Sequence, residues 1–542
     1  MMRRLPLLLF CLAATVLPVA AGETEVLLQR PSDAWVTYYA TPLFAEVNSG
    51  GGDLHLSVDL DSWRIDRTFS VDDGGRKRFE TFFPGRASGK FSWEMNGQSD
   101  QIYAHASGHR NENYDTDNRY IACVNGLLLR ELEEYRNDNS IANVTMQNIS
   151  SEDLPGLWQS YAGFACALIL DASEADRLRP DQKTALARWV NWFGGRLWLV
   201  GENGPATADA MGLSAKEDRD RYGVRRREFS SGAVYFMSKP DPGACMDAVR
   251  QSEYRDLLRY YYNTRNSYRY RNDELFDDPE RLSLGYVITC LVLLGLILGP
   301  VNYFYVKKKK SPLLFYVITP LAAGLGSLAI IGGSVLLEGG GNGKQVAALI
   351  RPAGGGEALF LDLRVVRSGF FTPTLRYPAD TLLLPYVTGS DDKFTLDIGT
   401  GVVAGGDWLK PRFVTGYISA RPVTSRMNLD LKREGDKWMV ENNLGHAVQW
   451  VSVSIPDGPD LYAENIAPGD RAELRRNTAR LSHESLCEDA GASLSIPLSP
   501  ERVLLIAGVA GLPYQDDGGL GTAMDTVGCY YILGGKGAGD GR

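Results

Sequence analysis

The sequence predicts a multidomain protein of α/β and all-β architecture, with two large regions joined by a two-helix transmembrane hairpin. Residues 23–110 alternate as short strands between glycine-rich turns, and residues 119–265 alternate apolar strands with helices. Two uncharged apolar runs then occupy residues 284–306 and 312–337, and residues 344–535 are strand-like again. A chain of 542 residues, 44% of them hydrophobic and 23% charged, can build several cores.

The N-terminus has the pattern of a secretory signal peptide over residues 1–22. Arg3 and Arg4 precede an apolar run at 5–17, and small residues follow at 19–21. An uncleaved anchor helix is the alternative, but the run is short for a span, which takes about 20 residues. The sequence therefore predicts export of the segment that follows.

The charge of the chain argues against nucleic acid as a partner. Cleavage after residue 22 would remove two of the 57 basic residues and none of the 66 acidic ones, leaving a net charge of −11. Binding to phosphate backbones needs clustered cations. An acidic surface instead suits a soluble exported region.

The first region is expected to be a β-sandwich over residues 23–110. Clear alternation occurs at residues 35–39, 54–58 and 91–95, and the triple glycine at 50–52 marks a turn.

The next region, residues 119–265, is expected to be a parallel sheet with crossover helices. Pro180 suits the first turn of a helix, which Gly194 and Gly195 should end. Strands are expected at residues 120–124, 141–146, 164–170, 197–200, 224–229 and 233–237, with helices at 127–137, 180–193 and 244–265. Residues 266–283 form a juxtamembrane segment that either rests on lipid headgroups or is a solvated face.

The hairpin has a predicted orientation. Each apolar run can cross about 30 Å of hydrocarbon as a helix; two core helices of a soluble protein are the alternative, but these carry a polar stripe. Lys307, Lys308, Lys309 and Lys310 crowd the loop 307–311, and short lysine-rich loops stay cytoplasmic. The sequence thus predicts a bacterial inner-membrane protein with both large regions in the periplasm. Asn302, about one turn from Lys307, is expected at the membrane interface.

The cysteine pattern predicts one disulfide and no zinc site. Cys487 and Cys529 are the only cysteines after the hairpin, and an oxidising compartment would allow them to pair. No CxxC spacing occurs, so neither a metal centre nor a redox motif is indicated.

Three segments in order resemble a group of uncharacterised bacterial inner-membrane proteins with a glutamine-amidotransferase-like domain. They are Leu178-x-Pro180-x-Gln182-x-x-Ala185-Leu186-x-x-Trp189-Val190-x-x-x-Gly194-Gly195, Leu298-Gly299-Pro300-Val301-Asn302-Tyr303, and residues 438–469. The resemblance covers most of residues 119–480. It implies a flavodoxin-like, class I glutamine-amidotransferase-like sheet, a transmembrane hairpin, flanking β domains and a C-terminal β-sandwich region. Because such proteins often occur with MoxR-type ATPases and von Willebrand A proteins, it also implies a role in cell-envelope assembly or stress.

The sequence argues against amidotransferase chemistry. Active members of that class place a cysteine in a Gly-x-Cys-x-Gly elbow and activate it with a histidine. The corresponding turn here, residues 201–205, has no cysteine, and residues 119–283 contain no histidine. We therefore expect a catalytically degenerate domain with no cofactor and no metal.

Asp171, Glu202 and Asn203 are the candidate ligand-binding residues. They follow two of the expected parallel strands, where such sheets bind ligands. A helix cap or a solvated loop is the alternative interpretation.

Three functions stay open. The first is a membrane-anchored periplasmic scaffold that binds envelope or inner-membrane proteins. The second is an envelope hydrolase or transferase that uses Asp171 and Glu202. The third is an anchor that binds cell-wall polysaccharide through its β-sandwiches.

Overall fold

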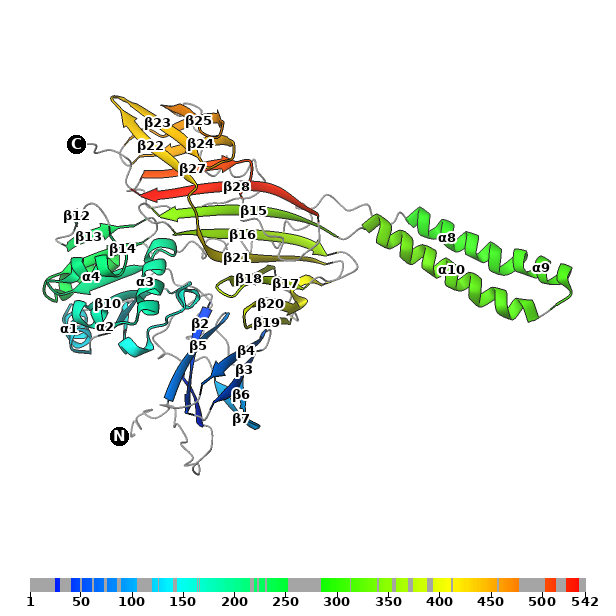
Figure 1. Cartoon of the computed structure of the whole chain (residues 1–542), viewed down its shortest axis with the longest axis horizontal. Helices are drawn as coiled ribbons and strands as arrows, with labels where there is room; N and C mark the ends of the chain where they lie inside the picture. The colour runs from blue at the N-terminus through cyan, green and yellow to red at the C-terminus, as the bar shows by residue number, and fades with distance from the viewer. Residues whose placement is uncertain are drawn as a thin grey trace, which may run out of the picture.

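The chain folds into a body of sheets and helices from which one pair of long helices projects (Figure 1). This computed structural model describes residues 25–29, 40–48, 51–60, 63–72, 76–84, 89–104, 119–124, 126–139, 144–162, 164, 166–214, 219–221, 224–229, 232–251, 284–311, 313–338, 341–352, 357–368, 374–387, 393–410, 413–455, 458–476, 503–512 and 523–535. The expected signal peptide and juxtamembrane segment lie outside these residues.

The α/β region is a seven-stranded sheet with helices on both faces. Its strands are β8 (Arg119–Cys123), β9 (Val144–Asn148), β10 (Cys166–Asp171), β11 (Arg196–Val200), β12 (Arg219–Arg221), β13 (Val224–Glu228) and β14 (Ala233–Met237). Its helices are α1 (Gly126–Asp138), α2 (Ala172–Arg177), α3 (Pro180–Trp192), α4 (Gly204–Ala210) and α5 (Pro242–Gln251). The parallel strands lie in the order β9-β8-β10-β11-β14, and β13 and β12 extend the sheet antiparallel.

The side chains of β10 point alternately to the two faces of the sheet, and helices cover both faces. Leu168 and Leu170 belong to the buried cluster that contains α3, whereas Ala167 and Ile169 pack in the cluster with α1 and α5. A strand buried on both faces reads as a continuous apolar run, as this one does.

Helix α3 begins and ends where the sequence predicts. Pro180 occupies its first turn, and the side chain of Gln182 accepts a hydrogen bond from the backbone N–H of Arg179 at 2.9 Å. Trp189 and Val190 are fully buried on its inner face. Gly194, with φ of 74°, ends the helix in the left-handed region that glycine adopts at low cost.

The N-terminal strands form two facing sheets, but the sandwich is not complete by residue 110. One sheet contains β1 (Glu25–Gln29), β2 (Ala40–Asn48) and β5 (Arg76–Pro84). The other contains β3 (Gly52–Leu60), β4 (Trp63–Val71), β6 (Gly89–Met95) and β7 (Gln98–Ala104), and is continued by β19 (Phe394–Ile398), β20 (Gly401–Gly406) and β17 (Leu375–Pro378). β19 pairs in parallel with β4, placing Phe394 opposite Trp63. Strands from after the helix pair therefore complete the sandwich expected from residues 23–110 alone.

The chain after the helix pair forms an eleven-stranded sheet. Its strands are β15 (Gly341–Pro352), β16 (Glu357–Ser368), β18 (Leu382–Val387), β21 (Val414–Thr424), β22 (Asn428–Glu434), β23 (Lys437–Asn443), β24 (Val448–Ser454), β25 (Leu461–Ile466), β26 (Arg471–Arg476), β27 (Val503–Val509) and β28 (Ala523–Gly535). Their order is β18-β21-β16-β15-β28-β27-β24-β25-β26-β23-β22. Ala347 and Leu349 of β15 pack with strands β22 to β26, while Val346 and Ala348 pack toward the other regions.

One contiguous buried cluster joins the three regions of the body. It contains Leu43 of β2, Leu186 of α3 and Leu361 of β16. Arg188 of α3 also donates to Glu357 of β16 through Nε at 3.0 Å and Nη2 at 2.7 Å.

The projecting pair consists of two antiparallel helices. The outgoing one comprises α8 (Leu284–Leu296), the π-helical turn η3 (Ile297–Val301) and α9 (Asn302–Lys309), and the returning one is α10 (Leu313–Glu338). Pro300, which has no backbone N–H, lies in the π-helical turn. Asn302 is only 2% exposed, and its Nδ2 donates to Thr319 Oγ1 at 3.1 Å. The side chain expected at a membrane interface thus links the two helices.

Candidate functional site

Asp171 lies where predicted, at the carboxyl end of β10, but its carboxylate accepts hydrogen bonds from the first turn of the helix that follows, α2. Oδ1 accepts the backbone N–H of Ser173 at 2.8 Å and the Ser173 hydroxyl at 2.6 Å. Asp171 is therefore the N-cap of α2. The structure supports the alternative interpretation given for this residue, a helix cap.

Glu202 and Asn203 follow the neighbouring strand and are both exposed. Register pairs Asp171 with Val200, so the three residues lie at the same sheet edge. Gly201, with φ of 131°, turns the chain out of β11, and Asn203 precedes α4 without a side-chain cap. Within the described ranges, no hydrogen bond or ion pair connects Asp171 to Glu202 or Asn203, and no group of three potential ligands surrounds a metal position.

Two cysteines of the α/β region, Cys123 and Cys245, are buried. Cys123 ends β8 and Cys245 lies in α5, and both pack in the cluster that covers one sheet face. Burial raises the pKa of the Cys245 thiol, and Cys123 and Asp241 add to the rise. A protonated, inaccessible thiol is a poor nucleophile.

The predicted disulfide stays a prediction. Cys529 lies in β28, opposite Ala347 of β15. Cys487 lies outside the residues that the structure describes.

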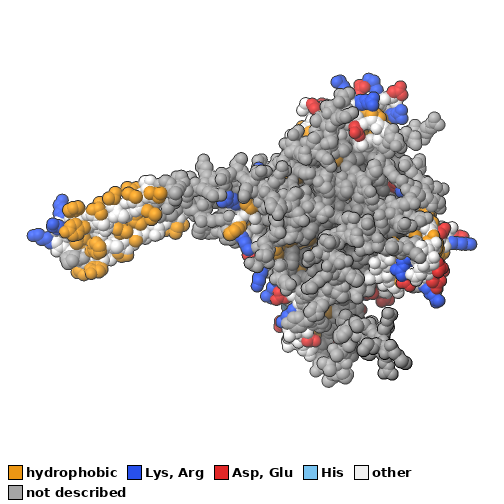
Figure 2. Space-filling model, turned by 180° about the vertical axis from the view of Figure 1, so that it is seen from behind, with side chains coloured by type: hydrophobic (Ala, Val, Ile, Leu, Met, Phe, Trp, Pro, Cys, Tyr) orange, Lys and Arg blue, Asp and Glu red, His pale blue; other side chains and the backbone are white. Residues whose placement is uncertain are grey.

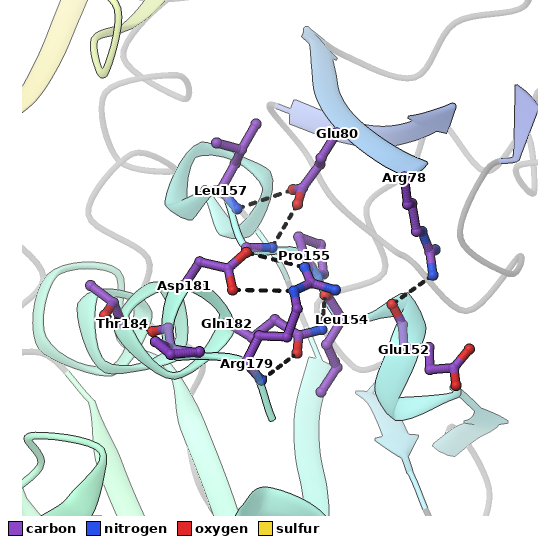
Figure 3. Close-up of polar contacts among 12 residues, drawn as sticks. Arg78, Glu80, Glu152, Leu154, Pro155, Leu157, Arg179, Asp181, Gln182 and Thr184 are labelled. Carbon is purple, nitrogen blue, oxygen red and sulfur yellow. Dashed lines mark hydrogen bonds and ion pairs between the residues drawn. The ribbon is translucent and has the colours of Figure 1, made fainter. Parts of the chain in front are cut away.

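The structure reveals a polar junction that the sequence did not predict: Glu80 and the loop after β9 (Figure 3). Glu80 lies on β5, and its carboxylate accepts the backbone N–H of Gly156 at 2.7 Å and of Leu157 at 3.1 Å, and the hydroxyl of Ser160 at 3.3 Å. Burial raises the pKa of Glu80, and these three donors oppose the rise. A carboxylate of the N-terminal sandwich thus fills an anion-binding set of donors in the α/β region.

Neighbouring residues extend the same junction. Arg78, two positions before Glu80, donates to the carbonyl of Glu152 at 2.9 Å and to Asp153 Oδ1 at 2.9 Å. Gln182 of α3 donates to the carbonyl oxygens of Ser151 at 3.0 Å and Leu154 at 2.6 Å. One signal could have revealed the junction, since strand alternation places Glu80 on the same face as Phe82, which is buried.

The helix pair is the largest exposed apolar surface in the described parts of the chain (Figure 2). By length and composition, one helical stretch there could cross a bilayer, Leu291–Lys309, and Leu313–Ala329 is a shorter apolar helix. Lys307, Lys308, Lys309 and Lys310 are exposed at the far end of the pair. The first three belong to α9 rather than to the expected loop 307–311, and Lys310, with φ of 54°, begins the turn.

Comparison with known proteins adds no family. No protein-family model matches the chain, and no curated protein is similar to it.

Proposed function

We propose that this chain is a membrane-anchored scaffold whose folded body binds other proteins at the surface of a bilayer. The observation that carries the proposal is the helix pair, whose apolar side chains are exposed along its length; Leu325 and Leu328, for example, are 60% and 65% exposed. Soluble proteins rarely expose so large an apolar surface without a partner. A bilayer satisfies it, with the four lysines emerging on the opposite side.

Pairing of β4 with β19 supports two crossings rather than one. Residues 63–67 precede the helix pair and residues 394–398 follow it, yet they form adjacent strands of one sheet. Adjacent strands must lie in the same compartment, so the chain between them crosses a bilayer an even number of times. α8 to α9 therefore carries the chain across, and α10, which has 26 residues, returns it.

The lysines give the orientation of this proposal. Short lysine-rich turns stay cytoplasmic, which places the body in the periplasm, in agreement with the signal-peptide pattern. The sheet order β9-β8-β10-β11-β14 corresponds to 2-1-3-4-5 in chain order, the flavodoxin-like order. This order supports the flavodoxin-like part of the expected fold. The proposed role in the cell envelope comes from the sequence resemblance.

The structural roles of the candidate residues favour a binding function over a catalytic one. Asp171 caps a helix, and the buried thiol of Cys245 is held protonated. If Asp171 and Glu202 instead formed a catalytic pair, Asp171→Ala/Glu202→Ala would remove an envelope phenotype that deletion of the protein produces.

Topology is the first test. A single cysteine in place of Asp436, in the exposed turn between β22 and β23, should react with a membrane-impermeant maleimide in intact cells; one in place of Lys308 should react only after permeabilisation. Cells whose Lys308 position reacts from outside would contradict the orientation. Soluble full-length protein without detergent would contradict the anchor itself.

Partner capture tests the scaffold. A photo-crosslinking residue at Glu202, exposed at the strand-end edge, should yield reproducible protein adducts in intact cells, identified by mass spectrometry. Asp436 provides the matched exposed control on the far sheet. If neither the Glu202 nor the Asp436 position gave protein adducts, the proposed binding role would be contradicted, and only the membrane anchor would remain.

A further inference from the structure

The end of the eleven-stranded sheet nearest the helix pair carries one unusual side chain. Phe413 is 64% exposed. Every other exposed large hydrophobic side chain among the described residues belongs to the helix pair. Phe413 immediately precedes β21, and its backbone N–H donates to the carbonyl of Lys410 at 3.2 Å, so the backbone that presents it is fixed.

Strand register places Phe413 beside the root of the helix pair. α10 ends at Glu338 and β15 begins at Gly341, three Cα steps later, so these two residues lie at most about 11 Å apart. Gly341 is opposite Ser368 of β16, and Arg367 of β16 is opposite Val414 of β21. Two strand spacings of about 4.8 Å thus separate the start of β15 from the residue next to Phe413.

The depth of Phe413 relative to a bilayer follows from the direction in which the strands run. β15, β16 and β21 run nearly along the axis of the helix pair (Figure 1). A step from strand to strand therefore runs parallel to the plane of a bilayer that the pair crosses. Phe413 then lies at about the depth of Gly341, where α10 leaves the hydrocarbon. Arg367, which is half-buried, lies at the same end of the sheet. So does Lys410, whose carbonyl accepts the Ser368 hydroxyl and whose Nζ pairs with Asp407 Oδ2 at 3.6 Å.

We infer that this sheet end is a membrane-contact surface, with Phe413 inserted among lipid headgroups and Arg367 facing their phosphates. Aromatic side chains favour the interface between hydrocarbon and water, and basic side chains favour anionic headgroups. The occupant is the lipid bilayer, because the surface continues the apolar helix pair. A contact away from the helix axes fixes the tilt of the body above the membrane, which the two antiparallel helices alone do not.

The inference rests on the proposed function, and one experiment separates the two. The photo-reactive residue p-benzoylphenylalanine replaces Phe413, Tyr316 or Asp436 in the full chain, in intact cells and in nanodiscs of phosphatidylethanolamine and phosphatidylglycerol. Tyr316, 76% exposed on the helix pair, reports insertion, and Asp436 reports a site distant from the membrane. All three are exposed, so the substitutions leave the core intact.

Phospholipid adducts at position 413 are expected at a yield about tenfold above position 436, because of the interfacial preference of aromatic rings. Lipid adducts at 316 but none at 413 overturn this inference alone. Protein adducts at 413 in cells also overturn it, since they assign the surface to a protein partner. No lipid adduct at 316 overturns the proposed anchor together with the inference.

Discussion

Two buried carboxylates, Glu80 and Asp362, stabilise the body in different ways. Glu80 lies between two regions and is held by neutral donors of a loop in the other region. Asp362 lies within one sheet and is held by Arg364, two residues along the same strand, at 2.7 Å from Nε to Oδ2. Neutral donors leave no charge behind when the carboxylate is removed, whereas an ion pair does. The two sites should therefore respond differently to substitution.

Asp362 lies in a fully buried polar group. Asp362 and Arg364 are each 1% exposed, and Gln345 Nε2 donates to Asp362 Oδ1 at 3.0 Å. Burial raises the pKa of Asp362, and Arg364 opposes the rise. Burial lowers the pKa of Arg364, but Asp362, Tyr377 and Tyr417 together outweigh it, so the net direction is upward. Within this buried group, Arg364 is the hydrogen-bonded cationic partner of Asp362.

Breaking this pair should give the largest effect. Arg364→Met removes the cation that is hydrogen-bonded to the buried Asp362 carboxylate, at a cost of about 3–5 kcal/mol. Thermal unfolding of the full chain in detergent should show a markedly lower midpoint. The double variant Asp362→Leu/Arg364→Met should unfold near the wild-type midpoint, because apolar residues of similar volume often replace a buried pair at little cost. Equal losses in the single and double variants would contradict an ion pair.

Removing the Glu80 carboxylate should cost less. Glu80→Ala strands two backbone N–H groups and a hydroxyl, and an unsatisfied buried donor costs about 1–3 kcal/mol. The N-terminal sandwich should also loosen from the α/β region, seen as faster proteolysis between them. Glu94→Ala, at an exposed site of the same sandwich, is the matched control. Similar losses of stability in Glu80→Ala and Glu94→Ala would show that the junction does not stabilise the protein.

A pH series sharpens the contrast further. Burial raises the pKa of Glu80 in the folded state, so its contribution to stability is complete below the unfolded value of about 4.3 and is lost as pH rises through the folded value. Glu80→Gln cannot ionise and lacks this loss. The midpoint of the variant relative to wild type should therefore rise as the pH increases above about 4. A constant difference would mean that the donors cancel the effect of burial.

Local elements could be predicted from the sequence, and long-range contacts could not. Pro180 and Gly194 set the bounds of α3 because caps depend on neighbouring residues. Pairing of β4 with β19 depends on residues far apart in the chain, and nothing local in either strand specifies it. Asp362 and Arg364 did leave a signal, as two opposite charges on one face of the strand within the apolar stretch 358–366.

At the candidate site, too, the position of the residues could be predicted from the sequence, whereas their contacts could not. Parallel-strand logic correctly placed Asp171, Glu202 and Asn203 at one sheet edge. What Asp171 does there depends on Ser173, two residues further on, whose N–H and hydroxyl both point at its carboxylate. Position in a fold is therefore a weaker guide to function than the hydrogen bonds a side chain already makes.

Asp171 and Glu202 give the smallest expected effect and extend the contrast to exposed carboxylates. Asp171→Ala should cost about 1 kcal/mol, because it removes the cap of α2. Glu202→Ala should change stability by no more than about 0.5 kcal/mol, since its side chain is exposed. Unfolding midpoints of both variants check this. If Glu202→Ala instead raised the midpoint, Glu202 would be held at a stability cost, as residues of a binding site often are. That outcome would support a ligand site at the sheet edge that contains Asp171, Glu202 and Asn203.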